Sequence, residues 1–263
     1  MTLSYLERAA VELLLLSMLA AIVGPLIVMR GRAFYSVALS HATFPGGVIA
    51  AMLGINVLFG QAVAALLLTV LLALLSRVKR QGAGTATGIV LVFGFALGSL
   101  LASLQGGSSI PVESLLIGSL FGVQTTDIVV AAVVLGSVVA VLGFTHRALF
   151  YDTFDRIGFR AAGGNPLLPE LVATAITAAT IVVAMPAVGA ILAVSLVVGP
   201  AATAQLLVRN IAWVPPVAFI LAVTASAVGL WLSWHFAVAA GGAIGLVVAL
   251  LFLLSLGVRA IRT

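Results

Sequence analysis

Residues 36–47 read SVALSHATFPGG and place one histidine, His41, inside an otherwise apolar stretch. Ser40 and Thr43 flank it, and Pro45 and two glycines follow. A proline removes one backbone donor and crowds the preceding turn, so we expect the helix to be weakened here. Polar groups at membrane depth are tolerated mainly where they face other protein or a water-filled path. His41 is therefore a candidate path residue; the alternative is a histidine that only hydrogen-bonds a neighbouring helix.

The overall composition is that of a protein embedded in a membrane. Hydrophobic residues make up 63% of the 263 and charged residues 7%, whereas soluble domains carry about 25% charged residues. The apolar runs have the length of about 20 residues that a spanning helix needs. We predict an all-α, polytopic transmembrane helical bundle that forms a single domain over residues 1–263. The chain has no cysteine, which excludes disulfides and thiolate metal sites.

Nine apolar runs are candidate spans. They lie at 11–29, 36–54, 57–76, 88–104, 128–145, 169–185, 187–207, 212–235 and 240–258. A shorter run at 110–123, which contains Glu113, is too short to cross a bilayer comfortably and is predicted to be re-entrant or interfacial. Only the tripeptide 185–187 is available for the turn between the sixth and seventh runs. If 169–207 is instead one kinked or broken element, the count changes.

The basic residues predict how these spans are oriented. With the N-terminus outside, every Lys and Arg except Arg8 falls on the inner side, as the positive-inside rule requires. The C-terminus is then cytoplasmic. The same rule accounts for the net charge of +5, so nucleic acid is not predicted as a partner. The first run is predicted to be a retained span and not a signal peptide, because no basic segment with a cleavage site precedes it.

The longest polar stretch, 146–169, is predicted to lie on the inner side. Its aromatic residues Phe150 and Phe154 are interleaved with charged ones. This pattern is typical of a short amphipathic helix docked on a partner protein, and also of an interfacial helix lying on the bilayer. Two acidic residues, Asp152 and Asp155, argue mildly against anionic lipid as the only partner.

The sequence contains no recognisable enzyme motif. It lacks a phosphate-binding loop, an HExxH motif and a GxSxG motif, and its single lysine, Lys79, is followed by Arg80. The chain is therefore not predicted to bind ATP or to be an enzyme. Glu113, Asp127 and His235 fall in or near predicted outer loops, where they either attract cations or are simply solvated; we favour the second reading. A transport path fits this sequence better than catalysis does.

Several motifs occur in one order along nearly the whole chain. They are Ala38-Leu39-Ser40-His41-Ala42 with Pro45-Gly46; Thr87-Gly88-Ile89-Val90 with Phe95-Ala96-Leu97-Gly98; Leu120-Phe121-Gly122; Phe154-Asp155 with Arg160 and Gly163; and Val188-Gly189 with Pro200-Ala201-Ala202-Thr203-Ala204. In these motifs the sequence resembles the permease subunits of bacterial ATP-binding-cassette (ABC) importers for manganese, zinc or iron.

The resemblance implies the membrane subunit of an ATP-driven importer for a divalent transition metal, with zinc or manganese ahead of iron. Its partners would be ABC ATPase subunits, an extracytoplasmic metal-binding protein, a second permease subunit and the lipid of the bacterial inner membrane. The chain itself would hold no cofactor. His41 would be a transient metal ligand in the translocation path, because a neutral imidazole suits such ions. The segment 154–163 would be the coupling helix seated on the ATPase, with Phe154, Asp155, Arg160 and Gly163 as its matching residues.

The sequence departs from the family pattern at Val37. The family carries an Asp there, four residues before the histidine and one helical turn away on the same face. A lone imidazole brings no negative charge to offset the lost hydration of a dication. We therefore expect weak resting affinity, and we expect a second His41 from a paired subunit to complete the site. Two alternatives stay open: an importer of the same fold for a chelated or uncharged ligand, and a carrier or channel that works without an ATPase.

Overall fold

A computed structural model of the chain describes residues 4–75, 83–104 and 118–262. All regular structure in these residues is helical. The elements are α1 (Tyr5–Met29), α2 (Ala33–Ala42), α3 (Phe44–Met52), α4 (Val57–Leu75), α5 (Ala83–Leu104), the 3-10 helix η1 (Leu120–Gly122), α7 (Thr125–Phe154), α8 (Arg156–Ala161), α9 (Leu167–Leu207), the 3-10 helix η2 (Ile211–Trp213), α10 (Val214–Phe236) and α11 (Ala240–Arg262).

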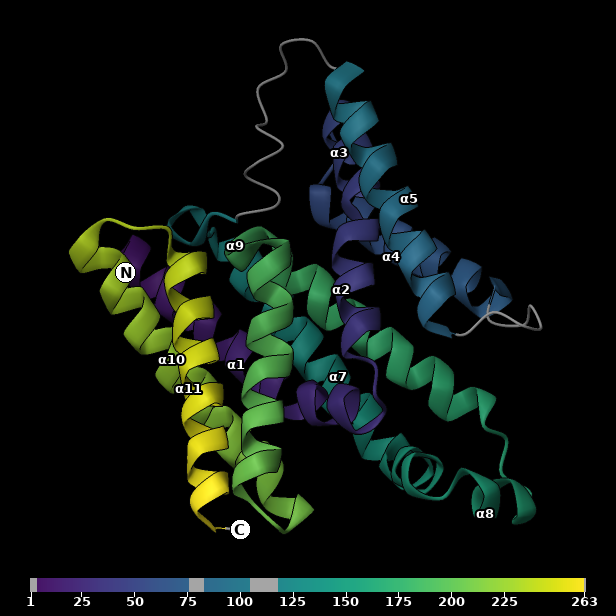
Figure 1. Ribbon diagram of the computed structural model, residues 1–263. Coiled ribbons are helices and arrows are strands. Elements are labelled where there is room, and N and C mark those ends of the chain that lie inside the picture. Colours follow the sequence, from purple (N-terminus) through teal and green to yellow (C-terminus); the bar gives the residue numbers. More distant parts are fainter. Residues whose placement is uncertain (1–3, 76–82, 105–117, 263) are drawn as a thin grey trace.

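The helices form a body and an arm. Figure 1 shows α1, α7, α9, α10 and α11 in the body, while α2 to α5 form an arm that extends to the upper right. The two parts are joined by contacts of α2 and α4 with α9. The first residues of α1 and the connection between α10 and α11 lie at the upper end, whereas α8 and the C-terminus lie at the lower end. The predicted all-α membrane bundle is confirmed.

The predicted spans correspond to helices wherever the structure describes them. Six helices in the described residues are long and apolar enough to cross a bilayer. One of these, α9, contains both runs between 169 and 207, and α2 with α3 covers the run 36–54. Helix α7 continues to Phe154, well beyond the predicted end at 145. Most of the run 110–123, including Glu113, lies outside the described residues, as do Arg77, Lys79 and Arg80.

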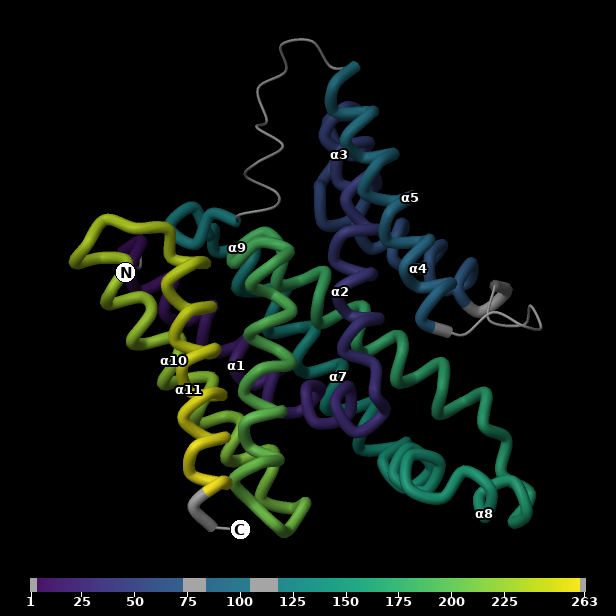
Figure 2. Tube along the Cα trace, in the orientation of Figure 1, coloured from purple at the N-terminus to yellow at the C-terminus, as the bar shows by residue number. Residues whose placement is uncertain are grey.

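The turn predicted at Met185, Pro186 and Ala187 is wrong. These residues are helical, and the backbone of α9 leaves helical geometry at Gly189, where φ is 81° and ψ is 164°. A positive φ of this kind is open to glycine because it has no Cβ. Figure 2 shows α9 as two legs that run in different directions, so the element is broken.

The break in α9 is covered by the segment that enters η1. A break frees backbone carbonyls of the preceding helical turn, and these need new donors. The Ser119 N–H donates to the carbonyl of Pro186 at 3.1 Å. Gly118 packs so closely on Gly189 that a Cβ on it would collide with the backbone there. The two glycines thus let one chain segment close the gap in the other.

The core of the body lies between α1 and α9. Leu13, Leu16, Ile181 and Leu196 are buried there, and a Cβ on Gly24 would collide with the backbone of α9. Small residues at helix crossings allow this close approach, which is how membrane helices associate without a hydrophobic driving force.

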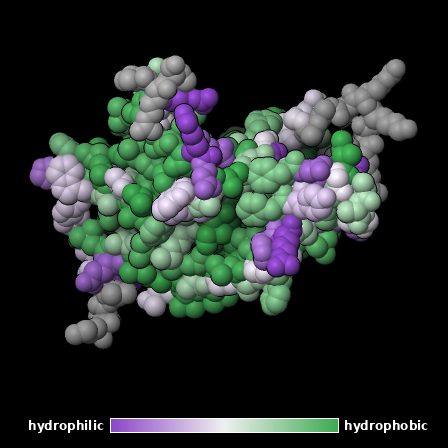
Figure 3. All heavy atoms as spheres, turned by 90° about the horizontal axis from the view of Figure 1, so that it is seen from below, coloured by the Kyte–Doolittle hydropathy of each residue, from purple (hydrophilic) through white to green (hydrophobic). Residues whose placement is uncertain are grey.

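The outward faces of the helices are apolar. Leu66, Phe93, Val133, Phe144 and Leu254 are all more than half exposed. Figure 3, the view from below, shows hydrophilic side chains only as separate patches on a largely hydrophobic surface. The exposed apolar side chains along the helices are suited to contact with lipid, which agrees with a multi-pass membrane protein.

A glycine pair sets the distance between α3 and α4. A Cβ on either Gly46 or Gly60 would collide with the carbonyl of the other. We expect Gly60→Ala to destabilise the protein by about 1–3 kcal/mol, because overpacking forces the backbones apart. Gly136→Ala is the matched control, since nothing lies within 4 Å of a Cβ there, and it should leave stability unchanged or raise it. Thermal unfolding in detergent measures both, and equal effects would contradict the close crossing.

Candidate functional site

His41 lies directly before a break between two short helices. It is the next-to-last residue of α2, Thr43 separates α2 from α3, and Pro45 lies in the first turn of α3. The predicted weakening of the helix is confirmed. The Thr43 hydroxyl lies 3.4 Å from the Met185 sulfur. This break therefore packs against α9 close to the break at Gly189.

The imidazole of His41 is held by its own helix. Its Nδ1 lies 3.0 Å from the Val37 carbonyl oxygen and 3.1 Å from the Ser40 hydroxyl. A carbonyl can only accept, so Nδ1 donates, and in the neutral ring Nε2 then keeps its lone pair. The ring is half-buried, and its centre lies 6.1 Å from the centre of the Phe95 ring. These bonds orient the imidazole and leave one nitrogen suited to bind a metal.

The described residues of one chain do not form a complete metal site. No group of three or more His, Asp or Glu side chains that would hold a metal is present in residues 4–75, 83–104 and 118–262. Val37 offers only its backbone carbonyl, which already accepts the hydrogen bond from His41 Nδ1. Metal sites in proteins generally use at least three or four ligands. Further ligands would have to come from outside this set of residues.

The four residues predicted for coupling lie in or next to one short helix, α8. Phe154 ends α7, Asp155 is the N-cap of α8, and Arg160 lies in its last turn. Gly163 follows with φ +82°. Within the predicted segment 154–163 the helix is limited to α8, because the backbone breaks at Asp155 (φ −141°, ψ 78°). The capping carboxylate explains this break, since Oδ1 accepts from the Gly158 N–H at 2.8 Å.

The coupling segment offers an apolar surface at the lower end of the molecule. Ile157 is 84% exposed and Phe154 is 59% exposed. Two aromatic pairs support them: Phe150 stacks on Phe154 with ring centres 6.0 Å apart, and Tyr151 meets Phe159 edge-on at 5.5 Å. Residues of this kind are typical of a contact with another protein or with lipid.

A buried ion pair fastens the end of α7 to the end of α1. Arg30 Nη2 lies 2.9 Å from Asp152 Oδ2, and these side chains are only 7% and 2% exposed. Arg30 Nε also donates to the Thr153 hydroxyl at 2.9 Å. Burial lowers the pKa of the Arg30 guanidinium, and the Asp152 carboxylate opposes this shift. Loss of either partner would leave a buried charge unpaired, which is strongly destabilising.

Glu170, at the start of α9, extends this pair into a network. It pairs with Arg32, the N-cap residue of α2, and lies 3.6 Å from Arg30 and 3.7 Å from Arg156. Arg156, at the start of α8, also lies 3.6 Å from Asp152. We call these five residues the inner ion network. From the sequence, its three arginines were interpreted as orientation signals, and their contacts with Asp152 and Glu170 were not predicted.

Two further candidates, Asp127 and His235, have local structural roles. Asp127 forms a capping box at the start of α7, where its Oδ2 accepts from the Gln124 N–H at 2.9 Å. His235 lies in the last turn of α10 and stacks on Trp231, with ring centres 5.4 Å apart. Glu12, which sequence reasoning did not single out, is 1% exposed in α1. The structure does not bring these residues together with His41 in a metal-binding group.

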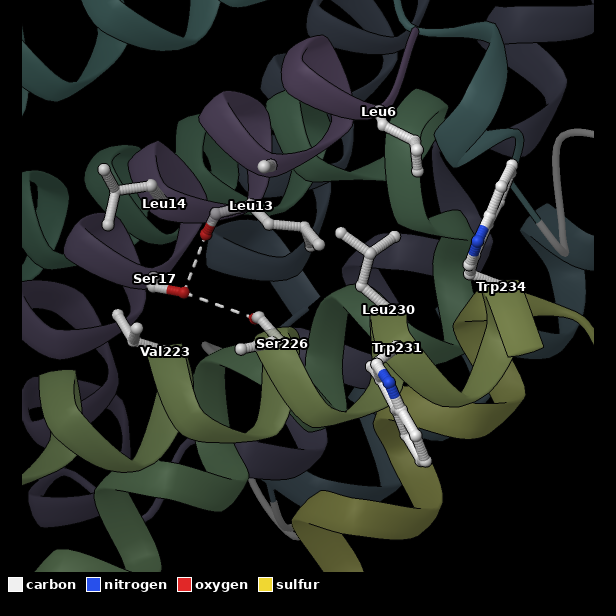
Figure 4. A pocket seen from close by; sticks show the side chains of 11 residues that line it. Leu6, Leu13, Leu14, Ser17, Val223, Ser226, Leu230, Trp231 and Trp234 are labelled. Carbon is white, nitrogen blue, oxygen red and sulfur yellow. Dashed lines mark hydrogen bonds between the residues drawn. The ribbon is translucent and has the colours of Figure 1, made fainter. Parts of the chain in front are cut away.

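An apolar groove of about 460 Å³ runs between α1 and α10. Figure 4 shows Leu13, Leu14, Leu230 and the two indoles lining it, with a hydrogen bond between serines of the two helices. That bond joins Ser17 and Ser226 at 3.4 Å. The groove presents no charged side chain among its lining residues. It is therefore unsuited to a metal ion.

Known proteins are similar to this chain in sequence and in fold. The model of the ABC 3 transport family matches residues 2–259. The manganese transport system membrane protein MntC of Halalkalibacterium halodurans is 29% identical over 252 residues, which cover 96% of this chain and 86% of that protein. A probable iron transport system membrane protein of Haemophilus influenzae is 27% identical, with coverage of 95% and 89%. The solved structure of PsaBC from Streptococcus pneumoniae in complex with Fab superposes with a TM-score of 0.85 at 29% identity, covering 97% of this chain and 91% of that one.

Proposed function

The chain belongs to the ABC 3 transport family, and from this premise we propose that it is the permease subunit of an ATP-driven importer for a divalent transition metal. The observation that carries the proposal is His41, whose free Nε2 lies at the break that packs against broken helix α9. Broken helices at membrane depth are a recurrent way to build transport sites.

The cargo we propose is manganese first, with iron and zinc as the other members of the class. The names of two relatives, one for manganese and one for iron transport, support this order. Imidazole binds all of these ions, so His41 alone does not discriminate between them. A second His41 from a paired copy, or the matching histidine of a sister chain, supplies the next ligand, in agreement with the incomplete site among the described residues of one chain.

The proposed partners follow from the two ends of the molecule. ABC ATPase subunits bind the segment around α8 on the cytoplasmic side and hydrolyse the ATP, while an extracytoplasmic metal-binding protein delivers the ion at the opposite end. The whole chain acts as one transmembrane domain in the bacterial cytoplasmic membrane, with the N-terminus outside. The N- and C-termini lie at opposite ends of the bundle, as this orientation requires, and the positive-inside rule chooses between the two directions.

The test is metal uptake by the purified complex in proteoliposomes. We expect an ABC ATPase to co-purify with the tagged chain, and we expect Mn²⁺ to accumulate only with ATP and the binding protein. Uptake without ATP, and with no ATPase bound, would contradict the proposal in favour of a carrier or channel.

One observation favours a second cargo class. Val37 is apolar, and the described residues hold no carboxylate group near His41 that forms a metal cluster. An importer of a chelated or uncharged ligand would need no such charge. Competition in the same uptake assay separates the two cargoes. Unlabelled Mn²⁺ should compete better than a Mn²⁺ chelate if the free ion is the cargo, and the chelate should compete better if the chelate is the cargo.

A further inference from the structure

We propose that Arg30 and Asp152 transmit movement of the coupling segment to the helix that carries His41. This rests on the proposed function and extends it with two positioning residues, which touch no cargo and act through other residues. The starting point is the inner ion network, in which the beginning of α8, the end of α7 and the beginning of α9 all reach the turn between α1 and α2.

The first step runs from α8 to Arg30. Arg156 begins α8, and its Nε lies 3.6 Å from Asp152 Oδ1. The other oxygen of the same carboxylate lies 2.9 Å from Arg30 Nη2. Arg30 is held on α7 at two more points, the Thr153 hydroxyl at 2.9 Å and the Leu149 carbonyl at 3.4 Å. Several charge-assisted contacts hold a planar guanidinium in one position as well as stabilising it.

The second step runs from Arg30 to α2 across a single residue. Gly31 has φ +65°, its N–H donates to the Val28 carbonyl at 3.0 Å, and the Arg32 N–H donates to the Ile27 carbonyl at 2.9 Å. This is the Schellman pattern of a helix C-terminus, with glycine in the left-handed position. Both ends of the turn are hydrogen-bonded, so displacement of Arg30 carries Arg32 with it.

The third step runs along α2 to the imidazole. Arg32 is the N-cap residue of α2, pairs with Glu170 and donates to the Thr174 hydroxyl at 3.2 Å. Helix α2 continues without a break from Ala33 to Ala42, and His41 is bonded within it. A helix transmits displacement along its axis because its backbone bonds hold each turn to the next. The coupling segment and His41 are thus connected by paired charges and one unbroken helix.

The experiment uses the full complex of permease, ATPase and binding protein in proteoliposomes. Asp152→Asn keeps the shape of the side chain and removes its charge. We expect Mn²⁺ transported per ATP hydrolysed to fall about tenfold, within the range typical of coupling between sites, while the ATPase still co-purifies. Arg147→Gln is the matched control, because Arg147 is an exposed arginine on the same helix. An unchanged ratio for Asp152→Asn would overturn the inference.

A double variant separates coupling from stability. Arg30→Met with Asp152→Leu replaces the buried pair by apolar side chains, a change that often preserves folding. Normal thermal stability with a low ratio of Mn²⁺ transported to ATP hydrolysed supports the inference. A ratio restored to the wild-type value overturns it, because packing alone would then suffice. Failure of the proposed function looks different: the unmodified complex would itself show no ATP-dependent uptake.

A distance measurement tests the same connection without altering the network. The chain has no cysteine, so nitroxides can be attached at Phe34→Cys on α2 and Phe144→Cys on α7, both more than half exposed and outside the coupling segment. We expect their separation to stay constant between nucleotide-free and nucleotide-bound complexes. The distance from Phe34→Cys to Leu253→Cys on α11 should change. A change in the first distance would overturn the proposed connection.

Discussion

His41→Ala should lower Mn²⁺ uptake by at least about tenfold, since even residues behind the ligands typically contribute 10- to 100-fold to metal affinity. The physical reason is the loss of the one imidazole at the break between α2 and α3, whose Nε2 is free to bind while Nδ1 is fixed by Val37. Uptake of radioactive Mn²⁺ by whole cells, corrected for the amount of protein in the membrane, measures the effect.

The matched control is His146→Ala. His146 is an exposed histidine on α7 whose Nδ1 also bonds to a backbone carbonyl, that of Gly143 at 3.0 Å. Removing it deletes the same chemical group at an exposed position away from the proposed path, so uptake should stay at the wild-type level. Normal uptake by His41→Ala at normal expression would remove His41 from the path.

Asp155→Ala should uncouple ATP hydrolysis from transport. The Asp155 carboxylate caps α8, which has only six residues, and loss of an N-cap costs about 0.5–2 kcal/mol. A helix this short has little else to hold it, because isolated helices of this length are unstable. We expect the variant complex to lose most of its ATP-dependent Mn²⁺ uptake and to bind the ATPase more weakly in co-purification.

The conservative change Asp155→Asn distinguishes the cap from the charge. Asparagine is as good an N-cap as aspartate, so this variant should retain most uptake. Loss of uptake in both variants would show that the carboxylate charge matters and not the cap. Full uptake in Asp155→Ala would contradict a coupling role for this segment.

The helical content and the break after His41 were predictable because their signals are local. Apolar runs of spanning length identify helices wherever they occur. Pro45 acts on its own neighbourhood in the chain, so the interruption at Thr43 follows from the residues beside it. The capping aspartate at Asp155 is a local signal of the same kind, although sequence reasoning used it only as a motif residue.

The break in α9 was misplaced because two signals competed. Pro186 is the stronger helix breaker in isolation, yet it lies within the helix. The chain changes direction three residues later at Gly189, where the backbone of Gly118 packs directly against the backbone of α9. That contact joins positions far apart in the sequence, and no local pattern reports it. Proline is tolerated inside membrane helices because neighbouring groups satisfy the freed backbone.

The inner ion network was not predictable from one sequence for a related reason. Arg30 and Asp152 are separated by 122 positions, and each has an ordinary explanation alone, one as a charge that orients the membrane spans and the other as part of an amphipathic stretch. Only the fold shows that both are nearly buried and point at each other. Glu170 was the one available hint, because it interrupts an apolar run directly after Pro169.

The contact between Gly118 and Gly189 limits how the upper end of the molecule can rearrange. Two backbones that already touch, with no side chain between them, cannot be compressed further. The part of α9 that ends at Gly189 therefore cannot move closer to η1. Any motion of that part must either carry η1 along or draw away from it, so this short 3-10 helix belongs to the mechanical frame of the protein.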